Sequence, residues 1–210
     1  MTVFPALALG FALGLRHAMD PDHIAAVSTI STGARSTWRA ALLGASWGAG
    51  HSISVLLVGG ALVILRLPMP ARLALALEFL VAIMLVGLGM RSLMARREQG
   101  EVPASRPLLI GVVHGLAGSA VLAFLLLSTA SSAWAATVYL LCFSVGTVAG
   151  MAVVTTAITL PARIRPARAP AFERTLRLAA GVASIGIGLA LAHRVGIRDG
   201  LFAAVPNWTP

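Results

Sequence analysis

Five ionisable side chains lie within eight consecutive residues near the start of the chain, from Arg16 to His23, in the order Arg-His-Ala-Met-Asp-Pro-Asp-His. Imidazole nitrogens bind nickel, cobalt, copper and zinc, and carboxylates add negative charge that compensates a divalent cation. His17, Asp20 and His23 are spaced by three residues, so a helical or slightly unwound segment can aim them at one point. We therefore interpret His17, Asp20, Asp22 and His23 as metal ligands.

The residues around this cluster are apolar, which implies that it lies inside a membrane-spanning helix. A charged group at the centre of a bilayer costs roughly 2.5 to 3.5 kcal/mol, so the cluster requires a cavity, partner groups or a bound ion. Pro21 removes a helical hydrogen bond and disfavours helical backbone at Asp20, while Asp20 can cap a second helix that begins at Pro21. We therefore predict a helix that is broken and unwound near Met19 and Asp20. The alternative, a solvated loop from Pro21 onward, fits poorly with the apolar residues 24–27 that follow.

A further histidine, His51, follows Gly50 in the next apolar segment, where glycines leave room for another backbone to approach. A lone histidine in an apolar helix is as often a packing residue as a ligand, but the nearby cluster favours ligation. Three other polar residues are candidates for a pathway along which the ion passes. They are Ser52, which follows His51; His114, which precedes a glycine-rich stretch; and Glu78, for which pairing with an arginine near the membrane surface is an equal alternative.

The composition assigns the whole chain to a membrane. Its 210 residues are 58% hydrophobic and only 11% charged, with a mean hydropathy of +0.91, whereas a soluble domain carries roughly 25% charged residues. About 20 apolar residues span the hydrocarbon core as a helix, and six apolar segments can be marked: 3–31, 40–65, 72–94, 107–130, 134–160 and 174–194. We expect an all-α integral membrane protein with a single transmembrane domain over residues 1–210 and a short polar tail over 196–210. The apolar N-terminus is expected to be a retained helix rather than a cleaved signal.

The sixteen basic residues are all arginines, and nearly all of them fall between the apolar segments. Eleven lie at the first, third and fifth connections, against four at the second connection and the C-terminal end together, and none at the fourth. Cytoplasmic loops of membrane proteins are enriched in basic residues. This asymmetry predicts that both termini lie outside the cytoplasm, and it accounts for the net charge of +9 without nucleic-acid binding.

The two halves of the chain resemble each other. The matching stretches are 14–18 with 111–115, 49–51 with 149–151, and 86–89 with 185–188. Because each half contains three helices, an odd number, the halves face opposite ways, as in the inverted repeats of many secondary transporters. We therefore predict two inverted three-helix repeats, over residues 3–94 and 107–194. Chance similarity among helices rich in glycine and alanine is the alternative.

Residue types and motifs that the sequence lacks argue against other functions. Cys142 is the only cysteine, so the chain cannot form an intrachain disulfide or act as a membrane thiol-disulfide electron carrier. No His-Glu-x-x-His motif occurs, which argues against an intramembrane metalloprotease. The chain is therefore not expected to be an enzyme or to hold a prosthetic group.

The segment around His17 resembles the His-x4-Asp-His signature of the nickel/cobalt transporter family, here His17, Asp22 and His23. The stretch 50–52, Gly-His-Ser, is similar to that family's second signature, a Gly-His-Ser on the next helix. The chain departs from the family in length, since members usually have eight helices with the signature in the second. It also lacks their acidic Asp-Thr-Ala-Thr-Glu motif. In these respects it is similar to a short branch that resembles urease accessory nickel transporters.

The resemblance implies a secondary transporter that takes up Ni2+ or Co2+ across a bacterial cytoplasmic membrane, with His17, Asp22 and His23 essential for transport. Export of the same metals, and a non-transporting accessory role in metalloenzyme maturation, are the alternatives. Long histidine-rich loops often accompany metal efflux proteins of related build, and their absence here favours uptake. The expected partners are a transition-metal ion and the lipid bilayer, with a homo-oligomer and a link to urease or hydrogenase maturation as further candidates.

Overall fold

The structure is a computed structural model that describes residues 3–31, 34, 36–67, 69–95, 102–129, 132–164 and 169–208. The regular structure of this part of the chain is entirely helical, which confirms the predicted all-α class. Its elements in order are α1 (Val3–His17), α2 (Pro21–Ser31), α3 (Thr37–Ser54), the π-helical turn η1 (Val55–Gly59), α4 (Gly60–Leu65), α5 (Ala71–Met94), α6 (Ser105–Thr129), α7 (Ala133–Ile164), α8 (Ala169–His193) and the π-helical turn η3 (Arg194–Arg198).

Each predicted apolar segment after the first corresponds to one uninterrupted helical stretch, and the first is divided between α1 and α2. α3, η1 and α4 follow one another without a gap, as do α8 and η3. Three boundaries differ from the prediction by four or five residues, and one of them is the start of α8, at Ala169 rather than at 174. α7 continues past Pro161 to Ile164, since a single missing hydrogen bond is tolerated in a membrane helix. The last helix extends to Arg198, into the segment predicted as polar tail.

The interruption of the first helix lies at the predicted place. α1 ends at His17 and α2 begins at Pro21. The backbone N–H groups of Met19 and Asp20 close α1 with hydrogen bonds of 2.9 and 3.0 Å to carbonyls three residues earlier. The N–H of Ile24 then donates to the carbonyl of Asp20 at 3.0 Å. Asp20 therefore occupies the position directly before α2, where its carbonyl accepts a helical hydrogen bond of that helix.

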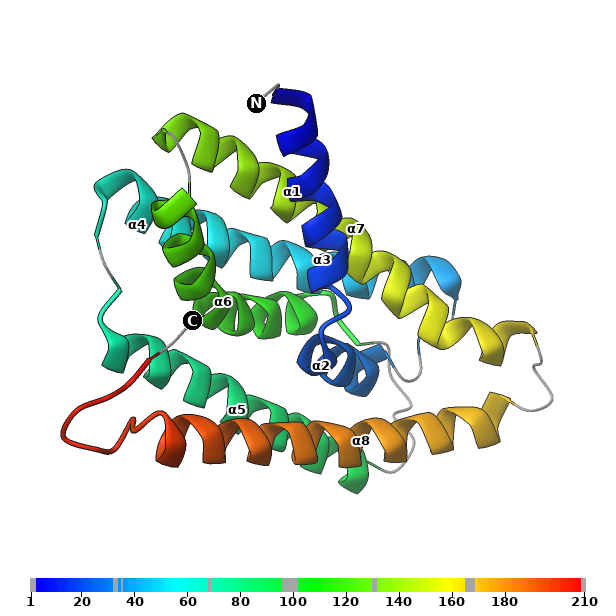
Figure 1. The fold of residues 1–210 in the computed structure, drawn as a ribbon. Coiled ribbons are helices and arrows are strands. Elements are labelled where there is room, and N and C mark those ends of the chain that lie inside the picture. The colour runs from blue at the N-terminus through cyan, green and yellow to red at the C-terminus, as the bar shows by residue number, and fades with distance from the viewer. Residues whose placement is uncertain are drawn as a thin grey trace.

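Figure 1 shows two groups of helices. α5 and α8 lie side by side along the bottom of the view, while α1, α3 and α7 form the upper group, and α2 and α6 lie between them. α1 packs along α7, α3 packs along both α6 and α7, and α5 packs along α8. α2 has its most extensive contacts with α8. The two parts of the broken helix therefore have different neighbours, α7 for α1 and α8 for α2.

Glycines allow the backbones of α1, α3, α6 and α7 to approach closely. A Cβ atom on Gly14 of α1 would lie 2.8 Å from the backbone nitrogen of Thr147 in α7. A Cβ atom on Gly111 of α6 would lie 2.9 Å from the carbonyl carbon of Trp47 in α3. No side chain fits at these separations without movement of the backbone, so glycine sets the distance between these helices.

The outer surface of the described helices is apolar, whereas much of their interior is polar. Exposed apolar side chains occur on the outward faces of the long helices: Leu80, Ile83, Val145, Val153, Val182 and Leu189. Buried polar side chains include Ser28, Ser52, Ser54, Ser144, Thr147, Thr155 and Ser184. Among the residues that the structure describes, four stretches are long and apolar enough to cross a membrane: Thr37–Leu65, Ala71–Met94, Trp134–Ala162 and Pro170–Arg198. Together these features identify a multi-pass α-helical membrane protein.

Arginines that flank the first, third and fifth connections make contacts that bring the described ends of these connections together. Arg39, at the start of α3, donates to the carbonyl of Val102 at 2.8 Å and so joins the first connection to the third. Arg177, near the start of α8, donates to a carbonyl at the end of α5, which joins the third connection to the fifth. At the other end of α5, Arg72 donates to the carbonyl of Ala203 in the C-terminal segment at 3.1 Å. Five further arginines of the topology prediction lie outside the described residues: Arg35, Arg96, Arg97, Arg165 and Arg168.

Candidate metal site

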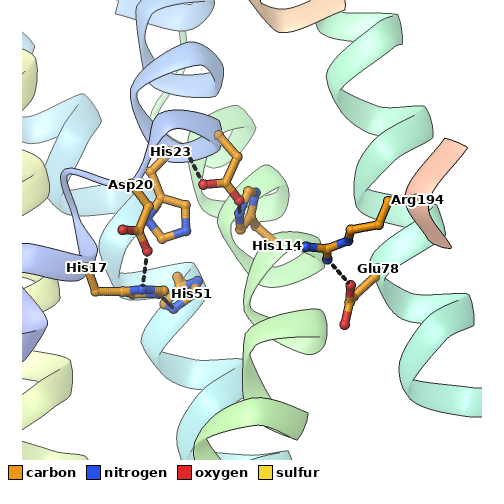
Figure 2. Close-up of polar contacts among 8 residues, drawn as sticks. His17, Asp20, His23, His51, Glu78, His114 and Arg194 are labelled. Carbon is orange, nitrogen blue, oxygen red and sulfur yellow. Dashed lines mark hydrogen bonds and ion pairs between the residues drawn. The ribbon is translucent and has the colours of Figure 1, made fainter. Parts of the chain in front are cut away.

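Four of the five histidines of the chain converge at the break between α1 and α2, as Figure 2 shows. They are His17 at the end of α1, His23 in α2, His51 in α3 and His114 in α6. The ring centroid of His23 lies 4.4 Å from that of His17, 5.3 Å from that of His51 and 4.5 Å from that of His114. Side chains from both halves of the chain therefore meet in one cluster, which we call the histidine cluster.

His17 lies between two polar partners. Its Nε2 is 3.2 Å from Nε2 of His51, and its Nδ1 is 2.8 Å from a carboxylate oxygen of Asp20. Asp20 was predicted either as a ligand or as a helix cap, and its carboxylate contacts the ring of His17. A carboxylate on one nitrogen of an imidazole fixes the tautomer and makes the other nitrogen a better donor to a metal ion. The geometry therefore suits Asp20 as a residue that positions His17.

The candidate ligand atoms of the histidine cluster fall into two groups. Those of His17, His23 and His51 lie within 4.8 Å of one another, and so do those of Asp22, His23 and His114. His23 belongs to both groups. The structure thus separates Asp22 from His17 and His51, and it places Asp22 beside a histidine that was predicted only for the pathway.

Asp22 connects α2 to α6. Its Oδ2 lies 3.0 Å from Nε2 of His114, and its Oδ1 accepts a hydrogen bond of 3.0 Å from the backbone N–H of His23. Both carboxylate oxygens are therefore engaged. Because α6 belongs to the second half of the chain, this contact could not be inferred from the spacing of residues within the first helix.

Several buried nitrogens of the cluster have no hydrogen-bond partner within the described part of the chain. They are Nδ1 of His23, His51 and His114, and Nε1 of Trp47. An unpaired buried polar atom costs about 1 to 3 kcal/mol, and such atoms in a native structure require a specific explanation. An imidazole nitrogen that carries no proton offers a lone pair to a metal ion. The unpaired nitrogens thus give the cluster an unused capacity for ligation.

Two aromatic side chains that the sequence did not single out line the cluster. Trp47 is fully buried and stacks on His51, with centroids 5.7 Å apart and planes inclined by 10°. Its ring also lies 4.9 Å from that of His23. Phe143 of α7 lies 5.1 Å from the ring of His17. Trp47 precedes His51 by four residues, which places both on one helix face and was an available signal, whereas Phe143 offered none.

Two predicted pathway residues have their partners elsewhere. Ser52 donates through Oγ to the carbonyl of Ser144 at 3.3 Å and so lies at the contact between α3 and α7. Glu78 of α5 accepts a hydrogen bond from Arg194 at 2.7 Å, visible in Figure 2, and another from Nε1 of Trp208 at 3.0 Å. This arrangement matches the alternative stated for Glu78, an ion pair with an arginine.

Comparisons with known proteins agree with a transport function. The family model NicO, described as high-affinity nickel-transport protein, matches residues 3–98. The urease accessory protein UreH of Bacillus sp. (strain TB-90) is 33% identical over 215 residues, which cover 93% of this chain and 94% of that protein.

Two plant proteins are more distant relatives. The chloroplast proteins FOR GROWTH AND FERTILITY 2 and 1 of Arabidopsis thaliana are each 28% identical over 87% of this chain. The matches cover 54% and 57% of their lengths, so the chain spans little more than half of each. No solved structure matches the chain. The chain belongs to the NicO family of nickel-transport proteins and is similar to UreH over almost its whole length.

Proposed function

We propose that this chain is a secondary transporter that takes up Ni2+, with Co2+ as a second substrate, across the bacterial cytoplasmic membrane. The ion binds to His17, His23 and His51, with Asp20 and Asp22 as the acidic members of the site. The observation that carries this proposal is the convergence of three imidazoles, two of them fully buried, at a break in a membrane helix. Discontinuous helices are typical of the substrate sites of secondary transporters.

The chemistry of the residues supports a late first-row ion. Imidazole suits nickel, cobalt, copper and zinc, whereas Mg2+ prefers oxygen ligands and holds its waters. Neutral imidazoles leave the charge of a divalent ion uncompensated. Asp20, in contact with His17, and Asp22, at the start of α2, supply two negative charges close to the three rings. One divalent ion would therefore be neutralised within the membrane.

We further propose that the helices form two inverted repeats, over residues 3–94 and 107–194, in one transmembrane domain. The contacts between α5 and α8 support this symmetry. A Cβ atom on Gly89 would lie 2.6 Å from the carbonyl oxygen of Gly181, and one on Gly188 would lie 2.8 Å from that of Ala82. Exchanging the two halves converts one of these contacts into the other.

The contacts of α1 with α7 and of α6 with α3 follow the same exchange. A Cβ atom on Gly14 would lie 2.8 Å from the backbone nitrogen of Thr147, and one on Gly111 would lie 3.0 Å from that of His51. Under this register Thr147, rather than Met151, corresponds to His51. The sequence match between 49–51 and 149–151 is therefore one helical turn out of register with these contacts. Small residues recur every four positions in α7, so both registers are plausible from the sequence.

The orientation we propose places the arginine-rich end of the bundle in the cytoplasm and both termini outside. Its support is the grouping of the first, third and fifth connections at one end through the contacts of Arg39 and Arg177. Basic residues are retained on the cytoplasmic side of membranes. The name of UreH further suggests that the nickel taken up is delivered to the maturation of a urease.

The test is uptake of radiolabelled nickel by cells that express the chain, with cobalt, zinc and magnesium as competitors. We expect uptake that excess magnesium leaves unchanged and that a His17→Ala, His23→Ala double variant loses at normal protein abundance. Full uptake by the double variant would show that the ion passes elsewhere. Loss of preloaded nickel from the cells would instead indicate export, and purified protein that moves no nickel into vesicles would indicate an accessory role.

A further inference from the structure

The histidine cluster contains one more group of ligands than a single binding position uses. We propose that Asp22, His23 and His114 form a second position for the ion, and that a divalent ion passes between the two positions while it remains bound to His23. In this transfer His17 and His51 are exchanged for Asp22 and His114. The inference rests on the proposed function, since it concerns the path of the same ion.

The placement of His23 supports its role as a ligand common to both binding positions. Its ring lies edge-on to His17 at 4.4 Å and edge-on to His114 at 4.5 Å, with interplanar angles of 81° and 73°. The rings of His51 and His114, by contrast, are 6.1 Å apart. His23 therefore lies between a histidine of α1 and a histidine of α6, within reach of an ion held by either.

The second group has the donor set that a divalent ion requires. Its atoms lie within 4.8 Å of one another, and Asp22 adds a negative charge to two imidazoles. His23 and His114 are almost completely buried, and Nδ1 of each has no partner among the described residues. The contact of 3.0 Å between Asp22 and His114 shows that these two side chains already face each other.

The shared ligand makes the two positions alternatives rather than a pair of simultaneously filled sites. A neutral imidazole has one free lone pair, because its other nitrogen carries a proton. His23 can therefore serve one ion at a time, and repulsion between two divalent ions at such short range acts in the same direction. The chain would hold a single ion that exchanges ligands on either side of His23.

A different role for His114 has to be distinguished, namely that it only positions Asp22 by donating a hydrogen bond. His114→Gln separates the two roles, since a glutamine amide can still donate to the carboxylate but is a poor ligand for nickel or cobalt. His51→Gln removes the first position in the same way. His193, which is exposed at the end of α8, provides the matched control His193→Gln.

The experiment uses the purified full chain in lipid nanodiscs, with Co2+ as a probe whose visible absorption reports its ligands. Wild type and His193→Gln should bind a single ion with the same spectrum. His51→Gln should still bind Co2+ with a changed spectrum, because the second position remains. The double variant His51→Gln, His114→Gln should bind at least about tenfold more weakly than His51→Gln, because losing a ligand should cost no less than losing a residue that only orients a ligand, which costs about tenfold or more. If His51→Gln and the double variant bind equally weakly, the second position does not exist.

Transport gives an independent readout. His114→Gln should keep binding close to that of wild type, through His17, His23 and His51, yet lose uptake by about tenfold or more. Unchanged uptake would assign His114 to positioning Asp22 and overturn the proposal. Should His51→Gln fail to fold, His17→Gln removes the same first position. Wild-type protein that neither binds Co2+ nor moves nickel would overturn the proposed function itself, which is a distinct outcome.

Discussion

Nε2 of His17 lies 3.2 Å from Nε2 of His51, so the end of α1 and the middle of the long helix 37–65 are joined by two imidazole nitrogens. Without an ion, one of the two nitrogens must carry a proton and donate a hydrogen bond to the other at this distance. Two nitrogens on one tetrahedral ion are about 3.3 Å apart when the metal–nitrogen bonds are about 2.0 Å. The two nitrogens are therefore already close to the separation that they would have on one tetrahedrally coordinated ion, and little side-chain movement is needed to admit such an ion.

This relationship predicts that His51→Gln impairs transport although it preserves polarity and approximate size. The amide cannot replace the imidazole as a ligand, so we expect nickel uptake to fall by about tenfold or more at equal protein abundance. His193→Gln, outside the cluster, should transport like wild type. Normal uptake by His51→Gln would mean that His51 only packs α3 and that the first position is formed without it.

Asp20 provides a test that separates three roles. As a residue that positions His17, it should be replaced best by asparagine, whose amide oxygen can still accept a hydrogen bond from Nδ1. Asp20→Ala and Asp20→Ser should both lower uptake, by about tenfold or more, because neither side chain reaches the ring. If Asp20 acts as a helix cap, Asp20→Ser should keep most activity. If it is a direct ligand, Asp20→Asn should be as impaired as Asp20→Ala.

The approach of α6 to α3 can be tested with a pair of glycine variants. A Cβ atom on Gly115 would lie 2.9 Å from Cα of His51, whereas one on Gly87 would meet nothing within 4 Å. Gly115→Ala should therefore destabilise the protein by about 1 to 3 kcal/mol, the usual cost of overpacking, and Gly87→Ala should not. Thermal melting of both purified variants gives the comparison, and equal melting temperatures would show that α3 and α6 are not in close contact at Gly115.

The contact between α1 and α7 can be captured as a disulfide because the chain has one native cysteine. A Cβ atom on Gly10 would lie 3.3 Å from Cβ of Cys142, close to the separation of about 3.5 to 4.5 Å found in disulfides. Oxidation of a Gly10→Cys variant should protect both thiols from maleimide labelling. Gly87→Cys is the control and should stay reactive, because Gly87 is exposed and a Cβ atom there would meet nothing within 4 Å. A reactive Gly10→Cys protein would contradict the described packing of α1.

The proposed orientation predicts where reporters fused to the chain will be active. Fusions after Arg97 and after Arg168 should report a cytoplasmic location, and a fusion after Ala133 should report an external one, since basic connections remain on the cytoplasmic side. The opposite pattern in cells would reject the proposed orientation, and a fusion after Ala133 that reports the same side as one after Arg97 would contradict the inverted repeat.

The sequence was sufficient for features that depend on local chemistry. The break before Pro21 follows from the missing N–H and from steric restriction of the preceding residue, and both effects act within two residues. The apolar segments likewise follow from composition alone. The class of the protein and the interruption of its first helix were therefore predictable without a structure.

Features that depend on the angle between helices were not predictable. Asp22 turns toward His114 because α2 leaves the line of α1, and nothing in the spacing of residues 16–23 reports that angle. The partner of Glu78 in the C-terminal segment, Trp208, is 130 residues away in the chain. The stacking of Trp47 on His51 was accessible from their spacing, but a tryptophan in an apolar helix carries no chemical signal by itself.

The break between α1 and α2 also gives the proposed metal site an electrical polarity. The C-terminal end of a helix carries a partial negative charge of about half an elementary charge, and the N-terminal end carries the opposite partial charge. His17 occupies the negative end of α1, where a cation is stabilised. Pro21 begins the positive end of α2, which would repel a cation, and Asp22 in the first turn of α2 offsets that charge. The two half-helices thus create a field gradient across a few residues, and replacing Asp22 would expose the repulsive end of α2 to the ion.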